Sequence, residues 1–136
     1  MRMPAEAFVD TNIVIYAFAT DDPQAATAGL ILSRRPAISV QVLNEFAAVC
    51  RRKQELPWDE IAARLAVVRE LCSAVLPLTI DVHATAMRLA ATAGIGVYDS
   101  LIVAAALQAG CATLWSEDMQ DGRLIDDRLT IRNPFN

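Results

Sequence analysis

Ala7-Phe8-Val9-Asp10-Thr11-Asn12-Ile13 is the segment from which the rest of the chain can be interpreted. Its first three residues are apolar, as is typical of a short buried strand, and Asp10 marks the point where the strand ends. Polar residues then lead into an apolar run that begins at Ile13, which indicates a short helix. An aspartate at such a junction is most often a helix N-cap. Thr11 and Asn12 compete for the capping role, which leaves Asp10 available for a functional one.

Strand and helix signals alternate along the whole chain. Strands separated by helices imply βαβ crossovers and a mostly parallel sheet that is covered on both faces. The 136 residues suffice for one domain spanning 1–136 and are too few for two. We therefore predict a single α/β domain with four to five strands. The strands are expected near 7–9, 37–39, 75–78, 111–115 and 129–131, and the helices near 13–16, 23–34, 40–53, 58–72, 80–94 and 98–109.

Four carboxylates, Asp10, Glu45, Asp99 and Asp118, each lie where an apolar run meets a polar break. Asp10 and Asp118 follow expected strands, and ligands of parallel sheets bind beyond the carboxyl ends of the strands. Glu45 and Asp99 lie on alanine-rich helices whose other residues are mostly apolar. If these elements pack together, four negative charges converge on one point.

Each carboxylate also has a simpler interpretation. Glu45 can be a glutamate at the rim of the core that pairs with an arginine, and Asp99 can be an ordinary helix-start aspartate. Asp118 lies in an acidic turn of the kind that is usually solvated, and Glu117 and Asp121 are its near rivals.

A cluster of four carboxylates would repel itself and raise its own pKa values unless a cation is bound there. Hard divalent cations prefer oxygen ligands and leave coordination positions for water and phosphate. The cluster therefore suggests metal-dependent phosphoryl chemistry. Arg52 lies two helical turns beyond Glu45, where it either contacts a phosphate of the substrate or remains a solvated side chain. No Ser-His-Asp or Cys-His catalytic set can be built around His83, the only histidine.

The composition limits the partners and the location of the protein. The net charge of −4 counts against a nucleic-acid enzyme, but 12 acidic residues against 12 basic ones remain when the four proposed ligands are set aside. The longest apolar run, Leu101 to Leu107, is far shorter than the roughly 18 residues of a membrane span. The segment from Met1 to Asp10 supplies no signal-peptide core. We expect a cytoplasmic protein with no membrane association.

Cysteine use and hydrophobicity add two expectations. Cys50, Cys72 and Cys111 are widely spaced in apolar contexts, which predicts buried, reduced side chains and no zinc site. The chain is 54% hydrophobic, with a mean hydropathy of +0.32. This surplus has to be buried inside the domain or against a partner, so we expect an oligomer.

Four fragments of the chain, taken in order, resemble the PIN-domain family, and within it the VapC-type toxins of bacterial toxin–antitoxin pairs. The closing Asn133-Pro134-Phe135 also resembles the tail of this family, and the likeness covers essentially the whole chain. The fragments are Phe8-Val9-Asp10-Thr11-Asn12-Ile13, Ser39-Val40-Gln41-Val42-Leu43-Asn44-Glu45-Phe46, Val97-Tyr98-Asp99-Ser100-Leu101-Ile102 and Leu114-Trp115-Ser116-Glu117-Asp118-Met119.

The resemblance implies a three-layer α/β/α PIN fold and a Mg²⁺- or Mn²⁺-dependent endoribonuclease. It assigns catalysis and metal ligation to the four carboxylates named above, and hydrolysis to water that the metal activates. Asn12 and Ser116 would orient carboxylates, water or phosphate, and Asp121 would assist Asp118 or substitute for it. The implied partners are an RNA substrate, a VapB-type antitoxin that inhibits the enzyme, and a second copy of the chain in a homodimer.

Two other functions stay open. An aspartate-based phosphatase also places an aspartate after its first strand, but it uses a lysine near the site, and the only lysine is Lys53 at the end of a helix. A non-catalytic module could use the acidic pocket to capture an arginine of a partner. The RNA target and its cleavage site, the antitoxin family, the number of metal ions and the dimer interface are not encoded in any recognisable motif.

Overall fold

The computed structural model describes residues 7–136. The prediction about a signal peptide concerned Met1–Glu6 in part, and these residues lie outside the described part of the chain. The described elements, in chain order, are β1 (Ala7–Val9), α1 (Thr11–Ala17), α2 (Gln24–Ser33), β2 (Ala37–Ser39), α3 (Val40–Arg52), α4 (Trp58–Leu71), β3 (Ala74–Leu76), α5 (Ile80–Ala93), α6 (Val97–Gln108), β4 (Thr113–Trp115), β5 (Leu124–Ile125) and β6 (Leu129–Arg132).

The strands form one sheet in the order β3-β2-β1-β4-β6-β5. All pairs are parallel except β5 with β6, which is antiparallel. The predicted α/β class with a mostly parallel sheet is confirmed, and β3 lies at an edge. The sheet has six strands within residues 7–136, and the additional one is β5. This two-residue strand is too short for a periodic signal, and its hairpin depends on positive φ angles at Asp126 and Asp127.

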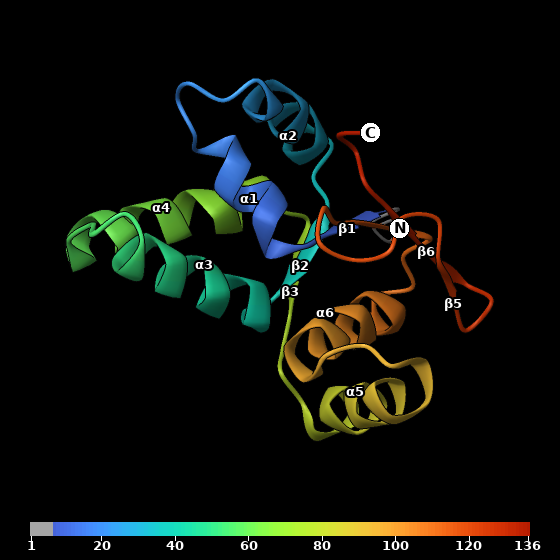
Figure 1. Ribbon diagram of the computed structural model, residues 1–136. Helices are drawn as coiled ribbons and strands as arrows, with labels where there is room; N and C mark the ends of the chain where they lie inside the picture. The colour runs from blue at the N-terminus through green and yellow to red at the C-terminus, as the bar shows by residue number, and fades with distance from the viewer. Residues whose placement is uncertain (1–6) are drawn as a thin grey trace.

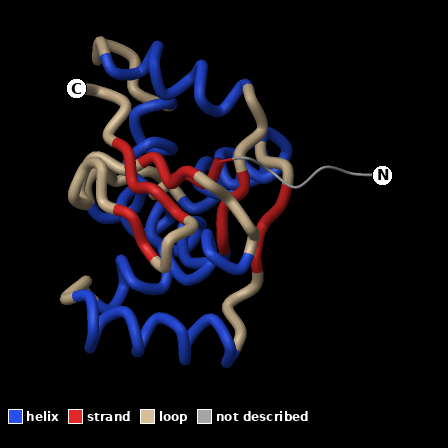
Figure 2. The backbone as a smooth tube through the Cα atoms, turned by 90° about the vertical axis from the view of Figure 1, so that its right-hand side faces the viewer, coloured by secondary structure: helices blue, strands red, loops and turns tan. Residues whose placement is uncertain are grey.

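The strand order determines which face each helix covers. Right-handed crossovers from β1 to β2 and from β2 to β3 place α1, α2, α3 and α4 on one face of the sheet. The chain then returns past β1 to β4, so the same rule places α5 and α6 on the opposite face. Figure 1 shows α5 and α6 packed together apart from the other helices, and Figure 2 shows the strands between layers of helix. The chain therefore has the three layers that were predicted.

Residues Leu101–Leu107 of helix α6 are all buried, so this helix packs into the core of its layer. It is joined to α5 by Gly94-Ile95-Gly96, in which Gly94 has a φ of +68° that favours glycine. No single helix within residues 7–136 has the length and apolar character needed to cross a bilayer, although α5 and α6 meet these criteria together as a pair bent by 118°.

The core also contains the three cysteines. Cys50, Cys72 and Cys111 are buried, and no disulfide joins them. Burial raises the pKa of the Cys72 thiol to about 11, with a small opposing effect of Arg35. These side chains therefore pack as small apolar groups, as the sequence predicted.

We expect Thr79→Ala to destabilise the protein by about 1 kcal/mol, because the Thr79 hydroxyl accepts a hydrogen bond from the Val82 amide at the start of α5. Thr92→Ala is the matched control, since the Thr92 hydroxyl bonds only to the Arg88 carbonyl of its own helix. Urea unfolding of both variants measures the difference. Equal losses of stability would contradict the capping role of Thr79.

Candidate functional site

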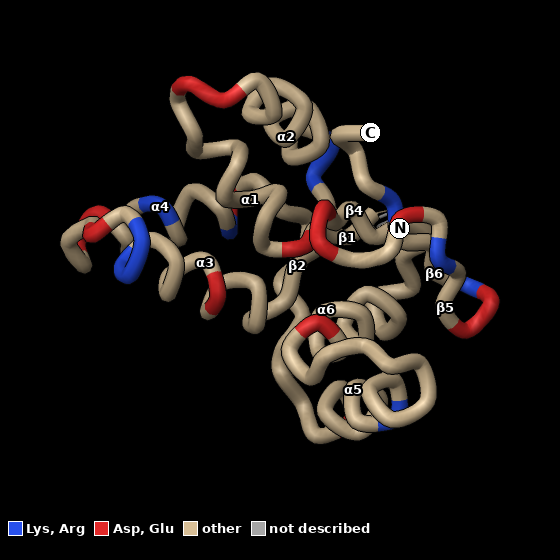
Figure 3. The backbone as a smooth tube through the Cα atoms, viewed as in Figure 1, with Lys and Arg blue, Asp and Glu red and all other residues tan. Residues whose placement is uncertain are grey.

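The candidate site lies where the strand order reverses, beyond the carboxyl ends of β1 and β4. The two strands pair in parallel, and the pairing continues one residue further because the Asp10 amide donates to the Trp115 carbonyl at 2.9 Å. Such a reversal point opens a crevice in which α/β proteins bind ligands. Figure 3 shows acidic segments at the start of α1, in the loop after β4, on α3 and on α6 around this region.

Asp10 is buried, and both of its oxygens accept hydrogen bonds. The Thr11 amide donates to Oδ1 at 2.7 Å, so Asp10 is the N-cap of α1. The Ser116 hydroxyl donates to Oδ2 at 2.7 Å, and the side-chain nitrogen of Asn12 donates to the same oxygen at 3.3 Å. The expectation that Thr11 and Asn12 compete for the capping role was therefore wrong. Asp10 caps the helix with one oxygen and faces the site with the other.

Asn12 connects the first strand to the acidic turn that follows β4. Its side-chain nitrogen also donates to Asp118 Oδ2 at 3.0 Å, and its side-chain oxygen accepts the Glu117 amide at 3.3 Å. One amide side chain thus holds Asp10 and Asp118, which are 108 positions apart, next to each other. The supporting role of Asn12 stays a prediction, and these are the contacts through which it would orient the two carboxylates.

Glu45 reaches the site from α3, and no basic side chain of residues 7–136 forms a salt bridge with it. The Thr11 hydroxyl donates to its Oε1 at 2.8 Å, and the Gln41 amide donates to its Oε2 at 3.0 Å. The alternative interpretation of Glu45 as a rim glutamate paired with an arginine was therefore wrong. Sequence reasoning missed Thr11 and Gln41 as orienting residues, although the spacing of four between Gln41 and Glu45 places both on one helix face.

Asp99 lies half-buried in the first turn of α6 and accepts no hydrogen bond from the residues that the structure describes. Its pKa is raised, first by burial and then by the negative charges of Glu45 and Asp118. The charge of Asp99 therefore has no local compensation apart from the helix terminus.

Asp10 shows the strongest electrostatic effect in the site. Burial raises its pKa to about 6, and the nearby charges of Asp99 and Glu45 act in the same direction. The hydrogen bonds from Ser116 and from the Thr11 amide oppose this rise without cancelling it. The four predicted carboxylates thus act on one another electrostatically, as expected of a cluster at one end of the sheet.

No basic side chain within residues 7–136 neutralises this cluster. The salt bridges in this part of the chain are Arg64–Glu60 and Arg88–Asp126, and both lie outside the site. Arg52 is exposed in the last turn of α3 and takes part in neither. Its proposed contact with an RNA phosphate stays a prediction.

The residues present fit a hard divalent cation by their chemistry, because all four groups offer carboxylate oxygens and lack a compensating charge. Within residues 7–136, no three acidic, histidine or cysteine side chains are arranged so that together they could hold a metal ion. Mg²⁺ binds commonly through one or two carboxylates and retains several waters, so three protein ligands are not required. The free oxygens of Asp99, together with Oδ1 of Asp118, are the most accessible donors.

The two rivals of Asp118 have other contacts. Glu117 Oε1 accepts the Tyr16 hydroxyl at 2.9 Å, and this bond is the main cause that raises the pKa of Tyr16 to about 12. Asp121 Oδ1 accepts the Asn133 amide at 2.9 Å and so fixes the C-terminal segment. The geometry therefore favours Asp118 over Glu117 and Asp121 as the fourth acid of the site.

The sequence profile of the PIN domain matches residues 7–121, which is most of the chain. This chain belongs to the PIN-domain family. The predicted family and fold are confirmed, and the acid cluster occupies the end of the PIN domain's sheet. A search of curated protein sequences gave no match.

Solved structures with the same fold come from several bacteria. The sarcin–ricin-loop-cleaving toxin VapC20 of Mycobacterium tuberculosis is 19% identical, with a TM-score of 0.66 over 82% of this chain and 89% of that one. A toxin–antitoxin complex from Klebsiella pneumoniae is 21% identical, with a TM-score of 0.69 over 94% and 97%. DNA-bound VapBC from Salmonella typhimurium is 17% identical, with a TM-score of 0.71 over 96% and 98%.

The raised pKa of Asp10 predicts a specific pH dependence of stability in the metal-free PIN domain. The folded protein retains the Asp10 proton up to about pH 6, whereas the unfolded chain loses it near 3.8. The stability that this group contributes is therefore present at low pH and is lost as the pH rises through about 6. When the pH is raised from 4 to 7, the free energy of unfolding of Asp10→Asn should therefore rise by roughly 2 kcal/mol relative to that of the wild type.

Urea unfolding in the presence of a chelator at pH 4 and pH 7 measures this difference. Asp81→Asn, at an exposed position in the first turn of α5, is the control and should follow the wild type at both pH values. If the free energies of unfolding of Asp10→Asn and the wild type differ by the same amount at both pH values, burial and neighbouring charge do not raise the pKa of Asp10.

Proposed function

We propose that this PIN domain is a VapC-type toxin, a divalent-metal-dependent endoribonuclease that a cognate antitoxin inhibits. The observation that carries the proposal is the group of four carboxylates around the carboxyl ends of β1 and β4. Burial and neighbouring negative charges raise the pKa of Asp10 and of Asp99, and no basic side chain of residues 7–136 forms an ion pair with the group. An enzyme that maintains such a cluster against its electrostatic cost needs it for a cation.

Each residue of the site has a definite task in this proposal. Asp99 and Asp118 would hold Mg²⁺ or Mn²⁺ with their free oxygens, and Asp10 and Glu45 would complete the acidic surface around it. The bound ion would polarise the phosphate and lower the pKa of water. The Ser116 hydroxyl donates its proton to Asp10, so it orients that carboxylate and is poorly placed to act as a nucleophile.

The orienting contacts hold the carboxylates in place. Hydrogen bonds to a carboxylate favour its charged form, so the Ser116 hydroxyl and the Thr11 amide oppose protonation of Asp10. Thr11 and Gln41 fix both oxygens of Glu45. Because water is the attacking group and the 3′-oxygen leaves, the products should carry 5′-phosphate and 3′-hydroxyl ends.

The structural neighbours support the substrate and the partner that we propose. One of them is a toxin that cleaves the sarcin–ricin loop, and another is a toxin–antitoxin complex. RNA as the substrate and a VapB-type antitoxin as the partner are consistent with these similarities. A cytoplasmic location follows from the proposed RNA substrate.

Homodimer formation is part of the proposal and is supported by exposed apolar side chains. Ile80, Leu30, Tyr98 and Trp58 are 81%, 68%, 67% and 62% exposed, respectively. Contacts that remove such side chains from water would stabilise an assembly. Light scattering of the purified chain gives its oligomeric state directly.

We expect Mg²⁺ or Mn²⁺ at millimolar concentration to raise the melting temperature of the chelator-treated protein. An ion at one hundred times its dissociation constant stabilises the folded state by about 2.7 kcal/mol. Asp99→Asn should remove most of this effect, because Asp99 accepts no hydrogen bond from the described residues and its oxygens are therefore available to the ion. Asp81→Asn should retain the effect. A wild type that responds to neither ion would favour the non-catalytic binding module.

RNA cleavage is the decisive test of the proposed function. Asp99→Asn and Asp10→Asn should each lower the initial rate of Mg²⁺-dependent cleavage by about a hundredfold or more, since electrostatic groups of active sites contribute on this scale. Both variants should remain folded, and Asp81→Asn should cleave at the wild-type rate. Wild-type rates for both site variants would refute these assignments, and release of phosphate from small phosphomonoesters without RNA cleavage would favour the phosphatase.

A further inference from the structure

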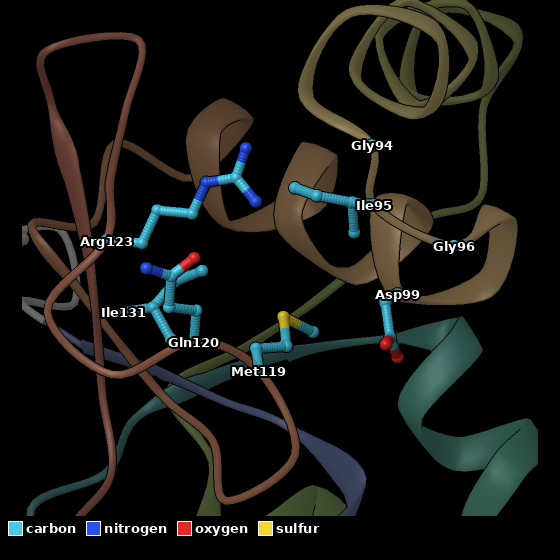
Figure 4. Close-up of a pocket in the computed structure, with 8 residues that line it drawn as sticks. All are labelled: Gly94, Ile95, Gly96, Asp99, Met119, Gln120, Arg123 and Ile131. Atoms are coloured by element: carbon cyan, nitrogen blue, oxygen red, sulfur yellow. The ribbon is translucent and has the colours of Figure 1, made fainter.

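A pocket of about 190 Å³ lies beside the acid cluster, on the side of α6. One wall is formed by the turn between α5 and α6 and by Asp99, and the other by the segment after β4 and by β6 (Figure 4). The lining residues are Gly94, Ile95, Gly96, Asp99, Met119, Gln120, Arg123 and Ile131.

The size of the pocket restricts its occupant to about one ring. A cavity of about 150 Å³ accommodates benzene, whereas pockets for drug-sized ligands start at about 300 Å³. The volume therefore fits a single planar heterocycle with its substituents, and the sugar and phosphate of a nucleotide would remain outside the pocket. Open space lies beside Gly94 and Gly96, because a Cβ at either position would have no atom within 4 Å.

The lining combines apolar walls with polar groups. Ile95, Met119 and Ile131 provide apolar surface, and the exposed Gln120 amide offers both a donor and an acceptor. One guanidinium nitrogen of Arg123 donates to the Ala93 carbonyl at the end of α5 at 2.6 Å, which anchors this side chain. A base that leaves the stack is recognised in this way, by contacts with its faces and hydrogen bonds to its edge.

The position of the pocket relates it to the proposed reaction. Asp99 belongs to both the pocket and the acid cluster, and Met119 directly follows Asp118. Figure 4 shows the Asp99 carboxylate directed away from Arg123. A phosphate held at the carboxylates would therefore have its neighbouring nucleoside at the mouth of the pocket.

We infer that this pocket is a subsite for the nucleobase next to the scissile phosphate and sets a base preference at that position. The inference rests on the proposed ribonuclease function. The lining carries one positive charge, on Arg123, and one negative charge, on Asp99. A neutral heterocycle with hydrogen-bonding edges therefore fits it better than a charged side chain of a protein partner.

Cleavage of a random-sequence single-stranded RNA pool, followed by sequencing of the new ends, tests this inference. Wild-type protein with Mg²⁺ should enrich one base at a position flanking the cut. Gln120→Ala should reduce that enrichment by about three- to tenfold, as expected from the loss of a hydrogen bond, while cleavage itself continues. Gln108→Ala, at an exposed glutamine at the far end of α6, is the matched control and should retain the wild-type preference.

The outcomes separate this inference from the proposed function. Cleavage with no flanking preference, or with a preference that Gln120→Ala leaves unchanged, overturns the subsite and leaves the ribonuclease proposal intact. A wild type that cleaves no RNA overturns both.

A binding measurement provides a readout that does not depend on cleavage. The four nucleoside 5′-monophosphates, titrated separately into metal-free protein, should shift the amide NMR signals of Gly94, Gly96 and Gln120, and most strongly with the base preferred in cleavage. Shifts caused by L-argininamide but by none of the nucleotides would overturn the inference in favour of a protein partner.

Discussion

The hydrogen bonds to the Asp10 carboxylate are the interactions on which the rest of the site depends. Three groups donate them, namely the Thr11 backbone amide, the Asn12 side chain and the Ser116 hydroxyl. The first two lie at the start of α1, and the third lies in the loop after β4. A buried carboxylate requires such partners, because burial without them would force it to keep a proton. Asp10 therefore fixes the start of α1 and the loop after β4 in one arrangement, and both segments contribute to the acid cluster.

This arrangement lowers the stability of the fold and provides a group of carboxylates that can take part in chemistry. Burial and the charges of Asp99 and Glu45 raise the pKa of Asp10, although two hydrogen bonds act against them. Asp99 has the same conflict with fewer contacts to relieve it. A domain selected only for stability would replace one of these acids with a neutral residue. Their retention together at one end of the sheet is the physical reason to regard the cluster as a working site.

The chain's local patterns were sufficient to predict most of the fold. The strand near 7–9 and the helices near 80–94 and 98–109 each depend on neighbouring residues, so periodicity and capping rules identified them. The four acids were found because each interrupts an apolar run. The bonds from Thr11 to Glu45 and from Tyr16 to Glu117 join distant segments, and β5 depends on a hairpin of two residues. No local pattern encodes these features.

The same distinction separates the chemistry of the site from its selectivity. Carboxylates and a divalent cation recognise phosphate and water, which are common to every position of an RNA chain, so they cannot distinguish one sequence from another. Selectivity has to arise from side chains outside the cluster that reach a base. In this chain, the turn at 94–96 and the segment at 119–123 approach the cluster most closely through a pocket. Both segments lie outside regular helices and strands, where residues can vary without disturbing the layers beneath them.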